Sequence, residues 1–232
     1  LLLTFPSETY LAEQMEVVDV DAIHAVRQFV VLKLAETLQS HFKALYETHH
    51  KDESGCFDSG AVGRRLIKNT CLSYLSKLET NDVYSIAITQ FKQAGNMTDQ
   101  IAALGSIVNS QHPEKAASLE AFYQQWQQEA LVIDKWFTLQ ACSSLPDAFN
   151  NVQALMQHSA FDLKNPNRMR SLIGAFSQSN PVNYHAINGE GYQFLANQVI
   201  ALNSINPQVA SRMVTALTQW RRFDESRQVL MK

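Results

Sequence analysis

Chain-breaking residues are scarce in this sequence. Eight glycines and six prolines make up about 6% of the 232 residues, against roughly 12% in an average soluble protein. All-β sandwiches and barrels need many tight turns, which glycine and proline commonly form. This scarcity argues against those architectures and favours a helical protein.

Cysteines are few, and long apolar runs and a strong net charge are missing. The three cysteines (Cys56, Cys71 and Cys142) are widely spaced and form no Cys-x-x-Cys motif. Such usage is typical of a reducing compartment, so we expect a cytoplasmic protein without a disulfide framework. No apolar run approaches the roughly 18 residues of a membrane span. A net charge of −3 with scattered Lys and Arg gives no reason to expect a nucleic-acid partner.

Helical periodicity dominates what is present. From Asp21 onward, apolar residues recur at spacings of three and four, which predicts one long helix that reaches Leu45 and is capped at its start by Asp19 or Asp21. The apolar stripe consists of Ile23, Val26, Val30, Leu34, Leu38, Phe42 and Leu45. Residues 49–63 hold three of the eight glycines and two adjacent histidines, so we expect a long loop there.

Shorter helices are expected along the rest of the chain. One is predicted to start at Asn81 and to end at Gly95, because glycine tolerates the left-handed conformation that follows many helices. Thr98 is expected to cap the next. Further amphipathic segments cover residues 66–78, 113–126, 132–141 and 148–156. Together they predict antiparallel helix pairs joined by short loops.

Three Asn-Pro pairs mark further helix starts, at residues 165–166, 180–181 and 206–207. Asparagine is a preferred N-cap, and proline suits the first helical position because its fixed φ is already helical. We therefore predict an all-α fold, an irregular α-solenoid or superhelical stack of antiparallel helix pairs. The chain does not begin with Met, and the helical pattern from Trp220 reaches Lys232 without a stop. We expect residues 1–232 to be a single domain of a longer protein, with a truncated final helix.

The usual local signatures of catalysis are absent. No Gly-x-Ser-x-Gly elbow, phosphate-binding loop or pair of histidines spaced by four occurs. Gly189 and Gly191 resemble part of a dinucleotide loop, but its third glycine is missing. Nothing in these patterns supports an independent hydrolase.

The arginines are more informative. Arg168 and Arg170 follow one Asn-Pro pair closely, and Arg212 follows another. A helix start already carries partial positive charge, so cations there are unfavourable. For any one of them a solvated surface residue is the simpler interpretation. Their repeated placement is a weak indication of a shared anion-binding surface.

Several of these stretches together resemble one family. The matching blocks are residues 95–99 with 102–104, 134–137 with 139–141, 165–176 with 180–181, and 206–212. In order and spacing they are similar to the C-terminal helical domain of bacterial aminopeptidase N, the zinc-dependent alanyl aminopeptidases among the gluzincin metallopeptidases. The resemblance extends from about residue 5 to the end of the chain.

The resemblance implies a non-catalytic role for this chain. In the family the zinc ligands, in a His-Glu-x-x-His motif, and the general base belong to a separate catalytic domain, so this chain alone is expected to hold no zinc and to be inactive. The helical domain is expected to cap the active-site cavity and to limit access to short peptides. Its partners would be the catalytic domain of the same polypeptide and short peptide substrates.

Site residues follow from the same resemblance. Arg212 first, and Arg170 second, are similar to family arginines that face the cavity, where a guanidinium suits a peptide carboxylate or carbonyl. Arg168 and Asn167 are expected to be structural. The alternative function is a free-standing helical scaffold that binds peptides or proteins through a concave face.

Overall fold

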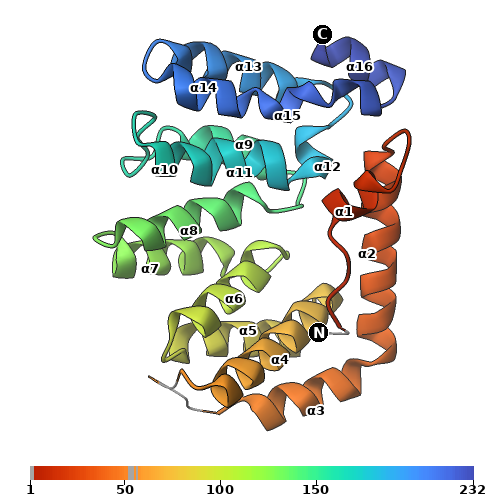
Figure 1. The fold of residues 1–232 in the computed structure, drawn as a ribbon. Helices are drawn as coiled ribbons and strands as arrows, with labels where there is room; N and C mark the ends of the chain where they lie inside the picture. Colours follow the sequence, from red (N-terminus) through yellow and green to blue (C-terminus); the bar gives the residue numbers. More distant parts are fainter. Residues whose placement is uncertain (1–2, 52–54, 56) are drawn as a thin grey trace. The chain divides into compact units, whose positions relative to one another are not determined.

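The computed structural model describes residues 3–51, 55 and 57–232. Over this part of the chain it contains helices joined by loops and no strand, apart from an isolated bridge between Val18 and Phe223 (Figure 1). The predicted all-α class is confirmed. The chain divides into two compact units. The first contains residues 3–5 and Val26–Gln124, and the second contains Pro6–Ala25 and Gln125–Lys232.

The first unit holds most of α2 and the five helices that follow it. These elements are α2 (Val20–Thr37), α3 (Gln39–His49), α4 (Ser59–Leu75), the 3₁₀ turn η1 (Ser76–Leu78), α5 (Asn81–Gln93), α6 (Met97–Val108) and α7 (Lys115–Trp126). Helices α3 and α4 pack together, as do α5 and α6. Helices that follow one another in the sequence therefore pack against one another, as expected for helix pairs.

The prediction of one long helix from Asp21 to Leu45 is wrong. The helix breaks at Leu38, whose φ of −107° and ψ of 16° leave the helical region, so that α3 starts a new direction. The break lets α3 pack on α4, where the Phe42 ring stacks on Tyr74 with centroids 4.8 Å apart. Val26, expected on the buried stripe, is 62% exposed. Packing of the second half against α4 therefore overrides the continuous apolar pattern.

The expected loop at residues 49–63 is shorter than predicted. Helix α4 already begins at Ser59, because the Asp58 carboxylate caps it by accepting the Ala61 N–H at 3.0 Å. Gly60 and Gly63 therefore lie inside the helix. Cys56 falls outside the described residues, whereas Cys71 is fully buried in α4, as expected for a small apolar side chain.

The other predicted caps have mixed outcomes. Asp19 caps α2 by accepting the Ala22 N–H at 2.9 Å, which confirms one of the two proposed caps. Helix α5 ends at Gln93 with Ala94 as its C-cap, so Gly95 directly follows the helix as expected, but its φ is not positive and the left-handed conformation is not used. Helix α6 is capped by Asn96 and not by Thr98. Asn96 caps the helix because its side-chain oxygen accepts the Asp99 N–H while its side-chain nitrogen donates to the Asp99 carboxylate.

The second unit contains the Asn-Pro helices. Its elements are α1 (Glu8–Glu13), α8 (Ala130–Ala141), α9 (Ala148–Leu155), α10 (Pro166–Met169), the π-helical turn η2 (Arg170–Gly174), α11 (Ala175–Ser179), α12 (Pro181–Tyr184), α13 (Glu190–Asn203), α14 (Pro207–Met213), α15 (Thr215–Thr218), η3 (Trp220–Arg222) and α16 (Glu225–Met231). Figure 1 shows α13 and α14 running side by side. All three Asn-Pro starts are confirmed, at α10, α12 and α14.

The three asparagines act differently. Asn165 and Asn206 accept backbone N–H groups of their own helices. Asn180 instead donates from its side-chain amide to the carbonyls of Ala141 and Ser143, at 2.9 and 2.7 Å, which joins the start of α12 to the end of α8. One short sequence signal therefore serves both local capping and tertiary packing.

The last helical stretch is divided, contrary to the continuous helix expected through Trp220. The turn η3 ends at Arg222, Phe223 is extended, and Asp224 caps α16 by accepting the Arg227 N–H at 3.0 Å. Asp224 thus starts a new helix by binding the backbone N–H three residues later, and the spacing of apolar residues does not indicate this start.

Candidate functional site

Arg168 is a structural residue of the second unit. It is 9% exposed, and its guanidinium donates to Asp134 at 2.5 Å, to the Ala130 carbonyl at 3.0 Å and to the Ala160 carbonyl at 2.9 Å. It also lies over the Phe137 ring. These bonds hold α10 against α8, so the positive charge near a helix start is neutralised by a carboxylate and buried carbonyls.

Arg170 lies at the first residue of the π-helical turn and is exposed. Its Nε donates to the Pro166 carbonyl at 3.0 Å, and its Nη2 donates to Asn167 Oδ1 at 2.9 Å. The side chain thus lies back along its own helix. Such π turns occur frequently at functional sites, and here the turn packs on α8, where Thr138 Oγ1 donates to the Ser171 carbonyl at 3.1 Å.

Arg212 is exposed and lies in the last turn of α14, where a cation is favourable, so the expected placement at a helix start is wrong for this residue. Its guanidinium makes no hydrogen bond or ion pair with any residue that the structure describes, and its carbonyl accepts from Thr215 Oγ1 at 2.6 Å. The side chain is therefore available for an external anion or carbonyl. That Arg170 and Arg212 face one cavity stays a prediction.

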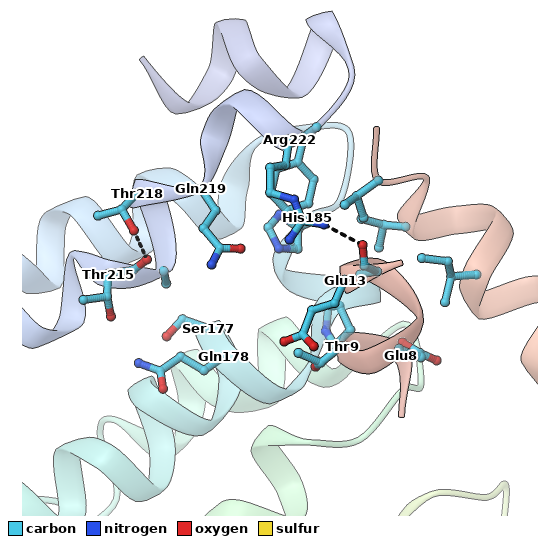
Figure 2. Close-up of a pocket in the computed structure, with 17 residues that line it drawn as sticks. Glu8, Thr9, Glu13, Ser177, Gln178, His185, Thr215, Thr218, Gln219 and Arg222 are labelled. Carbon is cyan, nitrogen blue, oxygen red and sulfur yellow. Dashed lines mark hydrogen bonds between the residues drawn. The ribbon is translucent and has the colours of Figure 1, made fainter. Parts of the chain in front are cut away.

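A pocket of about 350 Å³ opens elsewhere in the second unit, and Figure 2 shows its lining. Its walls come from α1, the start of α2, α11, α12, α15 and η3. Polar lining residues are Glu8, Thr9, Glu13, Ser177, Gln178, His185, Thr215, Thr218, Gln219 and Arg222, and apolar ones are Ala12, Val18, Val20, Ile23, Pro181, Ala216 and Phe223. Sequence reasoning missed this pocket, because no linear motif connects segments so far apart in the chain.

Arg222 fixes the wall formed by α1. Its Nη2 donates to the carbonyls of Ala12 at 2.7 Å and Met15 at 3.1 Å, at and just beyond the end of α1. In return, the Val18 N–H donates to the Arg222 carbonyl at 2.7 Å. A guanidinium at a helix C-terminus also complements the helix dipole. These hydrogen bonds hold α1 and Val18 against η3.

His185 lines the pocket with a neutral imidazole ring. Its Nδ1 pairs with the Tyr192 hydroxyl at 2.9 Å, and its ring stacks on Phe223 with centroids 4.3 Å apart. The Arg227 Nε donates to its carbonyl at 2.7 Å. Burial, and secondarily the charge of Arg227, lowers the pKa of His185 to about 4. This histidine is therefore uncharged near neutral pH and serves packing rather than proton transfer.

The described residues do not present metal-binding chemistry. Across residues 3–51, 55 and 57–232, no group of three or more His, Cys, Asp or Glu side chains is placed to hold a metal ion. No helix in the same part of the chain is long and apolar enough to cross a membrane. The pocket offers hydrogen-bonding side chains and the carboxylates of Glu8 and Glu13.

Comparison with known proteins gives consistent matches. A family model described as a domain of unknown function with ARM repeats (DUF3458_C) matches residues 1–232. The chain is 40% identical over 231 residues to aminopeptidase N of Escherichia coli (strain K12), and 38% identical over 232 residues to aminopeptidase N of Haemophilus influenzae. Each match covers the whole chain but 26% of the relative, so the chain spans about a quarter of their length.

A solved structure is similar as well. The crystal structure of Legionella pneumophila aminopeptidase A in complex with aspartic acid superposes with a TM-score of 0.90 at 32% identity. The match covers 99% of this chain and 28% of that chain. The helical arrangement described above is therefore that of one part of a larger aminopeptidase, and the resemblance inferred from the sequence is confirmed.

Proposed function

From the premise that this chain belongs to the DUF3458_C family of ARM-repeat domains, the kind found in bacterial aminopeptidase N, we propose that it is the non-catalytic C-terminal domain of a zinc-dependent aminopeptidase. The parent enzyme would release N-terminal amino acids from peptides. The observation that carries the proposal is the full-length match to relatives of which the chain forms only about a quarter.

Zinc would be held outside this chain. The described side chains offer no cluster of metal-binding donors, and aminopeptidase chemistry of this type uses zinc to supply an activated water. This chain would cap the active-site cavity of the catalytic domain and limit access to short peptides. We expect the parent to be cytoplasmic.

Arg212 and Arg170 would contact the peptide. The exposed Arg212 guanidinium has its donors uncommitted to any described residue, so a peptide carboxylate or carbonyl could take them without breaking an internal bond. Arg170 would have to give up its bonds to Pro166 and Asn167 first. The structure thus gives a physical reason to rank Arg212 ahead of Arg170.

The experiment that tests the non-catalytic role compares the chain with its parent. The purified 232-residue chain and the full-length polypeptide are analysed for zinc by elemental analysis and for hydrolysis of an alanyl substrate. We expect zinc and activity in the full-length protein only, with a His-Glu-x-x-His motif upstream in its sequence. Stoichiometric zinc in the 232-residue chain, or the absence of that motif from the parent, would refute the proposal.

The alternative function is a helical scaffold that binds peptides or proteins through one face. ARM repeats stack helices into extended surfaces, which favours this use in general. It is the weaker proposal, because the two relatives matched over the whole chain are both named aminopeptidase N.

A further inference from the structure

The pocket of the second unit contains a carboxylate without a partner. The exposed Glu13 lines it, and its carboxylate accepts no hydrogen bond and forms no ion pair with any described residue. Figure 2 shows this side chain directed toward the open region of the pocket. Glu8, the other acidic lining residue, is bound by His24 at 2.8 Å. Glu13 therefore keeps its full capacity to accept from a cationic donor.

The positive charge in the lining does not neutralise Glu13, because no ion pair joins Glu13 to Arg222. Arg222 is the lining residue with a permanent positive charge, and its Nη2 is held by the Ala12 and Met15 carbonyls. His185 is neutral, with its Nδ1 on the Tyr192 hydroxyl. An anionic ligand would be repelled by the Glu13 carboxylate, which no described residue pairs with. The pocket therefore favours a ligand that brings a positive charge of its own.

Neutral hydrogen-bonding groups surround the same space. The side-chain amides of Gln178 and Gln219 make no hydrogen bond with any described residue, and in Figure 2 the Gln219 amide points into the open region. Each amide offers both donors and an acceptor. The Gln219 amide suits a ligand that itself carries an amide, because it can both donate to and accept from such a group.

The remaining wall is aliphatic and the volume is small. Val20, Ile23, Pro181 and Ala216 line the pocket without polar atoms in their side chains. About 350 Å³ lies at the low end of the roughly 300–1,000 Å³ of ligand pockets. The space therefore suits a body of the size of one aliphatic amino acid.

We propose that this pocket binds a small ligand that carries an ammonium group beside an amide and an aliphatic body, as an amino-acid amide does, with Glu13 accepting from the ammonium group. Charge-assisted hydrogen bonds of this kind are about twice as strong as neutral ones. Binding at this pocket does not depend on the aminopeptidase role, because every group that it uses belongs to the second unit of this chain.

Leucinamide is the probe, and 4-methylpentanamide, the same molecule without its amine, is the neutral control. Binding to the full 232-residue chain is followed by methyl NMR, with the Ile23 and Val20 methyl groups as local reporters. We expect saturable shifts with leucinamide and at least tenfold weaker binding of 4-methylpentanamide. Glu13→Gln should weaken leucinamide binding at least tenfold. Glu16→Gln, at an exposed residue outside the lining, should leave it within twofold.

A second variant keeps the carboxylate and removes the space. Ala216→Phe places a large ring in the pocket and should abolish the leucinamide shifts while Glu13 is intact. The proposal is overturned by the absence of saturable shifts in the wild-type chain, by equal binding in Glu13→Gln, or by wild-type binding in a folded Ala216→Phe variant. None of these outcomes bears on whether the parent is an aminopeptidase.

Discussion

The buried ion pair of the first unit sets the largest single loss of stability that we expect. Asp99 in α6 is 5% exposed and Lys68 in α4 is 2% exposed, and the Lys68 Nζ donates to Asp99 Oδ2 at 2.7 Å. Asn69 and Asn96 donate to the same carboxylate at 2.9 and 3.0 Å. Burial opposes ionisation of Asp99, but these bonds outweigh it and lower its pKa. The pair thus joins two helices as charged partners.

Asp99→Asn keeps the shape of the side chain and removes its charge. It leaves the Lys68 ammonium buried without a counter-ion, and breaking a buried pair in this way costs about 3–5 kcal/mol. We expect a loss of this size in the free energy of unfolding of the first unit. Adding Lys68→Met to Asp99→Asn should cost less than the sum of the single changes, because the uncompensated charge is then removed as well.

Urea unfolding followed by far-UV circular dichroism measures both effects. Asp82→Asn is the matched control, since Asp82 is exposed and pairs with Lys43 at the surface, where a pair contributes no more than about 1 kcal/mol. A loss below about 1 kcal/mol for Asp99→Asn, or a double variant that shows simple additivity, would refute the reasoning.

Two further predictions concern the second unit. The pKa of His185 is lowered to about 4 by burial and then by Arg227, so the neutral ring contributes about 3 kcal/mol above its unfolded pKa near 6.5, and this is lost as pH falls from 6.5 toward 4. His185→Gln should flatten the stability-versus-pH curve there, and an unchanged slope would contradict the assignment. In the full-length enzyme, Arg212→Ala should lower kcat/KM for dipeptides and tripeptides at least tenfold, since a hydrogen bond to a charged group contributes about 1.5–3 kcal/mol. The control Arg221→Ala, at another exposed arginine, should not; unchanged kinetics in Arg212→Ala would count against a cavity role.

Features encoded by neighbouring residues could be predicted from the sequence. The starts at Asn165 and Asn206 depend on a side chain and backbone groups no more than three residues away, so the Asn-Pro pairs suffice to locate them. The same holds for the Asp19 cap. The all-α class follows from many such signals, and the scarcity of glycine and proline reflects the few tight turns that it needs.

Features that depend on distant residues could not be predicted. The break at Leu38 carries no local signal, because it is set by packing of α3 on α4. The pocket wall depends on a bond between Arg222 and Ala12, residues 210 positions apart, and the neighbouring bond between Arg227 and Asp21 spans 206. The spacing of residues in the sequence does not indicate hydrogen bonds between such distant positions.

Selection by substrate size is the central claim, and a series of substrates with the same N-terminal residue tests it most directly. The full-length enzyme is given an alanyl dipeptide, an alanyl pentapeptide and a folded protein with an N-terminal alanine, and kcat/KM is measured for each. A domain that caps the active-site cavity predicts efficient release of alanine from both peptides and at least a hundredfold lower kcat/KM for the folded protein. Equal kcat/KM for the folded protein and the dipeptide would contradict the account.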